Sequence, residues 1–148
     1  MTGQTDERKG YWPLHGWCGI ALVVVFWILN WSLSGLRTHW GFFPLWLGYA
    51  LTVDALVFLR KGCSLLTRNP TAYAGLFLAS APSWWLFELI NLRTQNWIYL
   101  GEETFTTYQF AALSTLSFST VMPAVFGTAE LAATWGCTAW SLQEETSS

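Results

Sequence analysis

The chain has 148 residues, of which 53% are hydrophobic, 18% aromatic and only 11% charged. A soluble domain carries roughly 25% charged residues, so this composition has too little charge to cover a surface that faces water. The formal net charge of -2, with no cluster of Lys and Arg that could neutralise phosphates, argues against a nucleic-acid partner. The composition therefore predicts an integral membrane protein whose first partner is the lipid bilayer.

The first predicted element is an apolar segment from about Trp17 to Leu36, which follows a polar amino-terminal tail at 1–10. This segment contains no charge, and its length of about twenty residues is enough to cross a hydrocarbon core of roughly 30 Å. A short polar turn at 37–40 leads to a second apolar segment, Gly41 to Leu59. So short a connection predicts an antiparallel helical hairpin.

Asp54 lies inside the second apolar segment, where a carboxylate must face protein, water or a partner. Lys61 follows seven residues later on the same helical face, so a snorkelling Lys61 or Arg60 is expected to compensate this carboxylate in part. The chain from Arg60 to Pro70 is basic and rich in turn residues, and Asn69 before Pro70 predicts the start of a third helix.

The third predicted span runs from about Thr71 to Asn91, and Pro82 inside it is expected to kink the helix. The end of this helix and the connection after it carry polar and aromatic side chains, several of them at helical spacing, which we expect to contact a ligand or a partner. These residues are Trp84, Asn91, Gln95, Trp97 and Tyr99. Glu88 lies on the same helical face as Trp84, Asn91 and Gln95. Its expected structural role is an interhelical hydrogen bond or an ion pair with Arg93.

The fourth predicted span begins near Phe105 and continues past Met122 as one long helix that is bent near Pro123. Small residues recur along it at every fourth position, and we expect this ridge to let another helix approach closely. The ridge consists of Ala111, Thr115, Ser119, Pro123 and Gly127. Glu130 is expected at the membrane interface, and residues 143–148 form a second polar tail.

Together these elements predict an all-α, polytopic membrane protein, a single transmembrane domain over 1–148 with four helices in an up-down bundle. Basic residues gather in the amino-terminal tail and in the loop after the second span. That side holds Arg8, Lys9, Arg60, Lys61 and Arg68, whereas the opposite loops hold only Arg37 and Arg93. Because basic loops stay inside, both termini are predicted to be cytoplasmic.

Side chains that could carry chemistry are few. Three cysteines, Cys18, Cys63 and Cys137, are scattered, and His15 and His39 are isolated, so the sequence predicts neither a metal site nor a disulfide framework. No phosphate-binding loop, nucleophile elbow or zinc-protease motif is present. The acids in or beside apolar segments, Asp54, Glu88 and Glu130, are the remaining candidates.

A longer pattern covers roughly residues 41 to 100. It consists of Asp54 with L-V-F and Arg60 after it, a basic loop, and Glu88 followed by W-x-Y at Trp97 and Tyr99. This pattern resembles the small membrane-embedded lycopene cyclase domains of carotenoid synthesis. The resemblance implies acid-initiated ring closure of an isoprenoid, with Asp54 and Glu88 as the matching acids. The paired acid of those domains, P-x-E-E, is absent, because Pro123 is followed by A-V-F-G-T-A.

Two functional hypotheses therefore stay open, and the sequence leaves undecided whether the protein is an enzyme. In the first, the chain is a small subunit that packs helix to helix within a larger membrane complex or with copies of itself. Its eleven tryptophans would then contact a carotenoid, a chlorophyll-type pigment, a quinone or lipid. In the second, the chain is a membrane isoprenoid cyclase in which Asp54 and Glu88, as buried carboxylic acids, donate protons.

Overall fold

The structure, a computed structural model, describes residues 11–33, 41–99 and 104–145, with side chains as far as Trp135. The described residues form helices and no strands, in the order α1 (Leu14–Ser32), α2 (Phe42–Lys61), α3 (Leu65–Arg68), α4 (Pro70–Thr94), α5 (Thr107–Phe118) and α6 (Val121–Glu145). The predicted tail at 1–10 and the turn at 37–40, with His39, lie outside the described residues. The predicted tail at 143–148 begins inside α6, and its last residues, 146–148, are also outside.

Three helical segments are long and apolar enough to cross a membrane: Leu14–Ser32, Phe42–Lys61 and Thr107–Trp135. This confirms the helical membrane-protein class and, by length and composition, three of the four predicted spans. The remaining helix, α4, is 25 residues long. It is not among the three, because serine, threonine, proline and tryptophan make it less apolar than the others.

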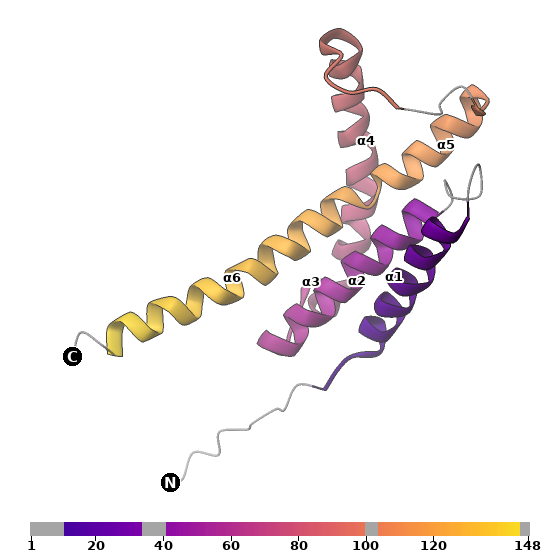
Figure 1. Cartoon of the computed structure of the whole chain (residues 1–148). Helices are drawn as coiled ribbons and strands as arrows, with labels where there is room; N and C mark the ends of the chain where they lie inside the picture. Colours follow the sequence, from indigo (N-terminus) through magenta and orange to yellow (C-terminus); the bar gives the residue numbers. More distant parts are fainter. Residues whose placement is uncertain (1–10, 34–40, 100–103, 146–148) are drawn as a thin grey trace.

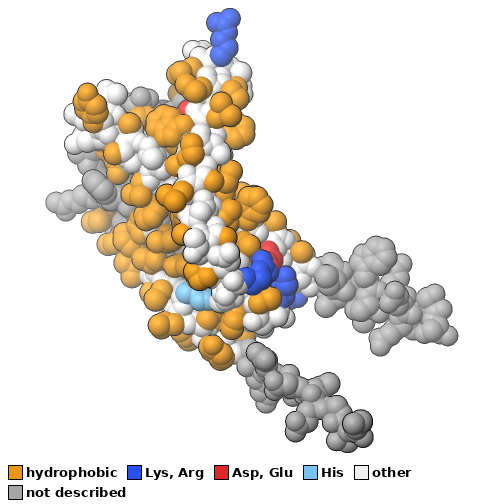
Figure 2. Space-filling model, turned by 180° about the vertical axis from the view of Figure 1, so that it is seen from behind, with side chains coloured by type: hydrophobic (Ala, Val, Ile, Leu, Met, Phe, Trp, Pro, Cys, Tyr) orange, Lys and Arg blue, Asp and Glu red, His pale blue; other side chains and the backbone are white. Residues whose placement is uncertain are grey.

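The outer surface carries large apolar side chains, as a surface in contact with acyl chains requires. Trp31 is 76% exposed, Leu78 is 79% exposed and Ile98 is 78% exposed. In Figure 2 hydrophobic side chains cover the middle of the visible face, while Lys and Arg gather toward its ends. A surface of this kind is stable only against lipid or other apolar helices.

Glycines bring α1 and α2 into direct backbone contact along their antiparallel packing (Figure 1). A Cβ atom on Gly19 would lie 2.6 Å from Thr52 Oγ1, and one on Gly48 would lie 2.8 Å from the Gly19 carbonyl oxygen. A Cβ atom on Gly16 would lie 2.6 Å from Ala55 Cβ. These positions leave no room for a side chain, so the glycines allow the close approach of the two helices. This seam between α1 and α2 was not predicted from the sequence.

α5 and α6 form one bent rod, which passes α2 and α4 before the end of α6 leaves the other helices (Figure 1). The helix is interrupted at Ser119 and Thr120, just before Pro123, which is where the sequence predicted a bend. Proline causes such a break because it lacks an N–H and its ring excludes the carbonyl group four residues earlier. Pro82, in contrast, lies inside α4 without interrupting it.

Ser80 of α4 forms hydrogen bonds with backbone groups on both sides of the break between α5 and α6. Its side chain is buried, and its hydroxyl donates a hydrogen bond to the Phe118 carbonyl while accepting one from the Met122 N–H at 3.0 Å. In a continuous α-helix these two backbone groups would bond to each other. The Ser80 hydroxyl has therefore taken the place of one missing helical hydrogen bond, and it holds α4 against the bend.

The residues of the predicted small-residue ridge differ in burial between α5 and α6. Pro123 and Gly127 are buried, and a Cβ on Gly127 would meet Val53 Cγ1 of α2 at 3.5 Å. On α5 the buried residues are Ser114 and Phe118, whereas Thr115 is exposed and Ala111 and Ser119 are half-buried. The break before Pro123 changes the helical phase, so a spacing of four residues does not continue along one face.

Candidate functional site

The first polar cluster lies where α2 ends, around Asp54. This side chain is only 1% exposed; its Oδ2 accepts a hydrogen bond from Ser64 Oγ at 2.6 Å and its Oδ1 accepts one from the Leu66 N–H at 3.0 Å. Ser64 is also the N-cap of α3, where its hydroxyl accepts from the Thr67 N–H. The carboxylate thus connects α2 to the turn that follows it, which is a structural use of a buried acid.

Two further polar side chains lie beside Asp54. His15 Nε2 lies 3.2 Å from Asp54 Oδ2, although the contact does not have hydrogen-bond geometry. Tyr73 interacts electrostatically with Asp54, and its hydroxyl is buried with no hydrogen-bond partner. The expected compensation by Lys61 is wrong, because Lys61 pairs with another acid.

Glu130 of α6 forms ion pairs with two basic residues, Lys61 at the end of α2 and Arg68 of α3. Its Oε1 accepts from Lys61 Nζ at 2.8 Å and from Arg68 Nη1 at 2.6 Å. The hydrogen bond with Glu130 raises the pKa of the Arg68 guanidinium. Arg60 joins the same region by donating to Thr134 Oγ1 at 2.7 Å. Glu130 therefore fastens α6 to the basic end of the molecule, where Figure 2 shows an acidic group beside blue side chains.

The second polar cluster lies at the far end of α4, around Glu88. Its Oε1 accepts from the Tyr99 hydroxyl at 2.5 Å and, at 3.3 Å, from Trp97 Nε1. The Asn91 amide bonds both backbone groups of Trp97, donating to the carbonyl at 2.9 Å and accepting from the N–H at 3.2 Å. Gln95 ends the helix with a φ of 51°, which reverses the direction of the chain. The reversal brings the side chains of Trp97 and Tyr99 into contact with Glu88.

This arrangement brings together the residues that the sequence analysis placed on one face and in the connection after it. Glu88 bonds to the connection of its own helix, and no ion pair with Arg93 is present in the described part of the chain. Burial, followed by the hydrogen bond to Glu88, raises the pKa of the Tyr99 hydroxyl. Tyr99 therefore stays protonated as the donor to this carboxylate.

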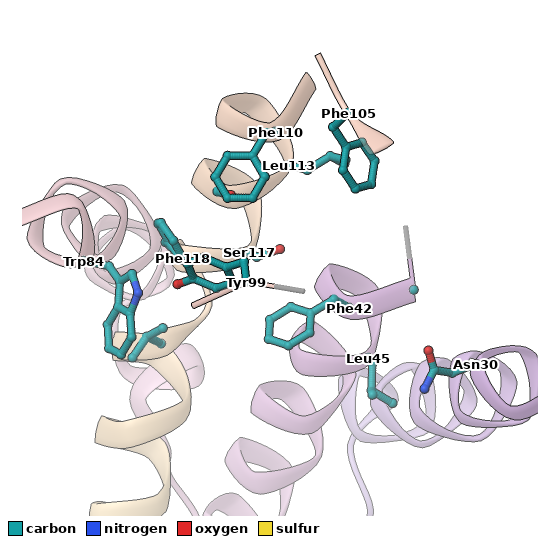
Figure 3. Close-up of a pocket in the computed structure, with 13 residues that line it drawn as sticks. Asn30, Phe42, Leu45, Trp84, Tyr99, Phe105, Phe110, Leu113, Ser117 and Phe118 are labelled. Carbon is teal, nitrogen blue, oxygen red and sulfur yellow. The ribbon is translucent and has the colours of Figure 1, made fainter. Parts of the chain in front are cut away.

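A cavity of about 550 Å³ lies between α1, α2, α4 and α5 (Figure 3). Its walls are mainly aromatic: Phe42, Trp84, Tyr99, Phe105, Phe110 and Phe118. Asn30, Ser114 and Ser117 add polar groups to the lining. The volume falls within the range of sites that hold small molecules and cofactors.

Trp84 is the one predicted contact residue that reaches this cavity from the face of α4. Its ring packs 5.9 Å from the Phe118 ring, and Figure 3 shows the indole nitrogen turned toward the cavity. Trp84 Nε1 is buried and makes no hydrogen bond of ordinary geometry. It lies near enough to the Tyr99 hydroxyl to oppose in part the rise in the pKa of Tyr99.

A second cavity, of about 540 Å³, contains the Glu88 cluster, with Trp85, Trp97 and Leu89 among its lining residues. Tyr99 and Phe110 line both cavities. The Tyr99 hydroxyl therefore stands between the Glu88 carboxylate and the first, aromatic cavity.

Asp54 and Glu88 do not meet. Tyr73, near Asp54, and Glu88 are fifteen residues apart on α4, which corresponds to a rise of about 22 Å along the helix. Asp54 and Glu130 lie toward one end of the structure, with the basic residues that follow α2, and Glu88 lies toward the other. Chemistry that needs Asp54 and Glu88 side by side therefore has no site in this structure.

Tyr73, Ser64 and Ser80 belong to polar contacts that were not predicted from the sequence. Ser64 had a local signal, because it stands three residues before Thr67, with which it forms a capping box. Tyr73 and Ser80 interact with residues that are distant along the chain, and no local pattern indicates such contacts.

No group of His, Cys, Asp and Glu side chains within the described residues is arranged to hold a metal ion, and Cys18 and Cys63 are free thiols. Comparison of the chain with protein-family models, with curated proteins and with solved structures gives no match. The function is therefore inferred from the geometry of the polar clusters and cavities alone.

Proposed function

We propose that the chain is a small integral membrane subunit that holds an apolar ligand of lipid or pigment type between its helices. The observation that carries this proposal is the aromatic cavity of about 550 Å³ between α1, α2, α4 and α5. Rigid aromatic walls bind apolar ligands at a small cost in side-chain entropy. Neither Asp54 nor Glu88 lines this cavity, which favours binding over acid chemistry there.

The outer faces support the second part of the proposal, namely that the chain packs against other membrane subunits or copies of itself. Trp27 and Trp31 form an exposed pair on α1, with ring centroids 6.4 Å apart. Val125 and Phe126 are exposed on α6, which leaves the other helices. Such flat aromatic and branched side chains suit helix-to-helix contact within a membrane.

For the topology we propose four spans with both termini in the cytoplasm. At 25 residues α4 measures about 37 Å, which exceeds the thickness of the hydrocarbon core. The basic residues Arg60, Lys61 and Arg68 lie together at the end that the positive-inside rule assigns to the cytoplasm.

Thiol labelling of intact cells tests this topology. With Cys18 and Cys137 replaced by alanine, Cys63 in the basic loop is expected to react only with a membrane-permeant reagent. A cysteine at the exposed Ile98 position is expected to react with an impermeant one. The opposite pattern would contradict the proposed orientation.

Filling the cavity tests the ligand. Leu113→Trp inserts a large ring into the lining, and we expect it to weaken binding roughly tenfold, because steric overlap of this kind costs about 1–3 kcal/mol. The matched control is Leu116→Trp on the same helix, at a side chain that is 41% exposed and outside the cavity. The measurement is the amount of lipid-class compound extracted from protein purified in mild detergent. A wild-type protein that runs alone and carries no such compound would refute the proposal.

A membrane isoprenoid cyclase is the second candidate, and one observation favours it. Glu88 lines the second cavity beside Trp85 and Trp97, whose ring faces could stabilise a carbocation after proton donation. In this candidate Glu88 acts without Asp54, which lies at the other end of α4. Unchanged lycopene in a lycopene-producing host that expresses the chain would exclude it, as would full activity of Glu88→Gln.

A further inference from the structure

The polar atoms of the aromatic cavity restrict what can occupy it. Trp84 Nε1 is buried and has no hydrogen-bond partner of ordinary geometry. A hydrocarbon ligand would leave this N–H with only the poorly aligned Tyr99 hydroxyl near it, which costs free energy in an apolar site. A ligand with an acceptor oxygen at that point would remove the cost.

The neighbouring groups indicate that the missing partner is an acceptor. The Tyr99 hydroxyl already donates its proton to Glu88 Oε1 at 2.5 Å, so Trp84 supplies the free donor on this wall. An indole N–H can only donate, and carbonyl oxygens are its usual acceptors. Ser114 and Ser117 contribute hydroxyl groups from α5 to the same lining.

The remaining walls favour a flat ring. Phe42, Phe110 and Phe118 approach the cavity from α2 and α5, and their rings offer faces and edges against which a planar ligand can stack (Figure 3). We propose that the cavity takes a planar ring bearing a carbonyl oxygen, of the quinone class, which accepts a hydrogen bond from Trp84 Nε1. This inference deepens the proposed function and rests on it.

Two probes and two tryptophan variants test the inference on the full chain in dodecyl maltoside. The probes are decylubiquinone, which carries ring carbonyls, and dodecylbenzene, which has a flat ring and a tail but no acceptor oxygen. Trp84→Phe keeps an aromatic wall and removes the N–H. The control is Trp85→Phe, because the Trp85 N–H is already bonded to Thr115 Oγ1 at 3.0 Å and does not line the first cavity.

Calorimetric titration is expected to show that Trp84→Phe weakens decylubiquinone binding by roughly three- to tenfold, the value of one hydrogen bond. Dodecylbenzene binding by Trp84→Phe and decylubiquinone binding by Trp85→Phe are expected to stay within twofold of wild type. Without ligand, Trp84→Phe is expected to lower the melting temperature less than Trp85→Phe does, because both variants lose part of a packed ring and only Trp85→Phe also loses a hydrogen bond.

The outcomes separate the two proposals. If wild type and Trp84→Phe bind decylubiquinone equally well, the assignment of the acceptor is wrong while the cavity remains a ligand site. If wild type binds dodecylbenzene as tightly as decylubiquinone, the preference for a carbonyl is likewise wrong. If the folded protein binds neither probe, the proposed function fails and this inference fails with it.

Discussion

Asp54→Ala is expected to lower the free energy of unfolding by about 3 kcal/mol, because two charge-assisted hydrogen bonds are lost and their donors stay buried. The donors are the Ser64 hydroxyl and the Leu66 N–H, which hold the turn between α2 and α3. The measurement is denaturant unfolding in detergent, followed by tryptophan fluorescence. An unchanged unfolding midpoint would show that this carboxylate does not hold the turn.

Asp54→Asn is the matched variant. Its amide oxygen can still accept from the Leu66 N–H, and the Ser64 hydroxyl can turn to accept from the amide nitrogen. We therefore expect a loss of only about 1 kcal/mol. Asp54→Asn also separates two roles of this residue. If Asp54 is structural, the asparagine variant keeps both its stability and its activity. If Asp54 donates a proton, the variant keeps its stability and loses its activity.

Gly48→Ala is expected to destabilise the protein by about 2–3 kcal/mol, because the added Cβ overlaps the backbone of α1. This atom would lie 2.8 Å from the Gly19 carbonyl oxygen and 2.9 Å from the Val23 nitrogen. Backbone atoms cannot move aside as a flexible side chain can, so the two helices must separate. The same unfolding measurement applies.

Gly75→Ala is the control for the glycine seam. A Cβ at Gly75, inside α4, meets nothing within 4 Å, so alanine is expected to stabilise the helix by roughly 0.5–1 kcal/mol. The double variant of Gly19 and Gly48 is expected to cost less than the sum of the single variants, since one overlap already separates the helices. Equal effects at Gly48 and Gly75 would show that close approach of α1 and α2 contributes nothing.

The members of the Glu88 cluster were predictable from the sequence, but their contacts were not. Glu88, Asn91 and Gln95 share a helical face, and that face is visible in the spacing of the residues along the chain. The partners of Glu88 depend on the reversal of the chain at Gln95, which adopts a left-handed conformation. Helical spacing cannot predict such a reversal, so the interhelical bond or Arg93 pair was expected instead of Trp97 and Tyr99.

Lys61 illustrates the same limit for charge pairs. Its position seven residues after Asp54 suggested a pair within α2, but its Nζ lies 2.8 Å from Glu130, 69 residues away in the sequence. The path of α6 across the end of α2 decides this pairing. Asp54 is satisfied instead by the turn before α3, and His15 of α1 lies beside it.

The amino-acid sequence by itself determined that the helices are apolar enough for a membrane, where they lie along the chain and that one of them is interrupted before Pro123. These features follow from hydropathy, helix length and the missing proline N–H, which act within a few neighbouring residues. Tertiary structure alone decided the glycine contact of α1 with α2, the insertion of Ser80 into the broken helix and the aromatic cavity. Each of these depends on the distance between segments far apart in the chain, and that distance is set by how closely whole helices can pack.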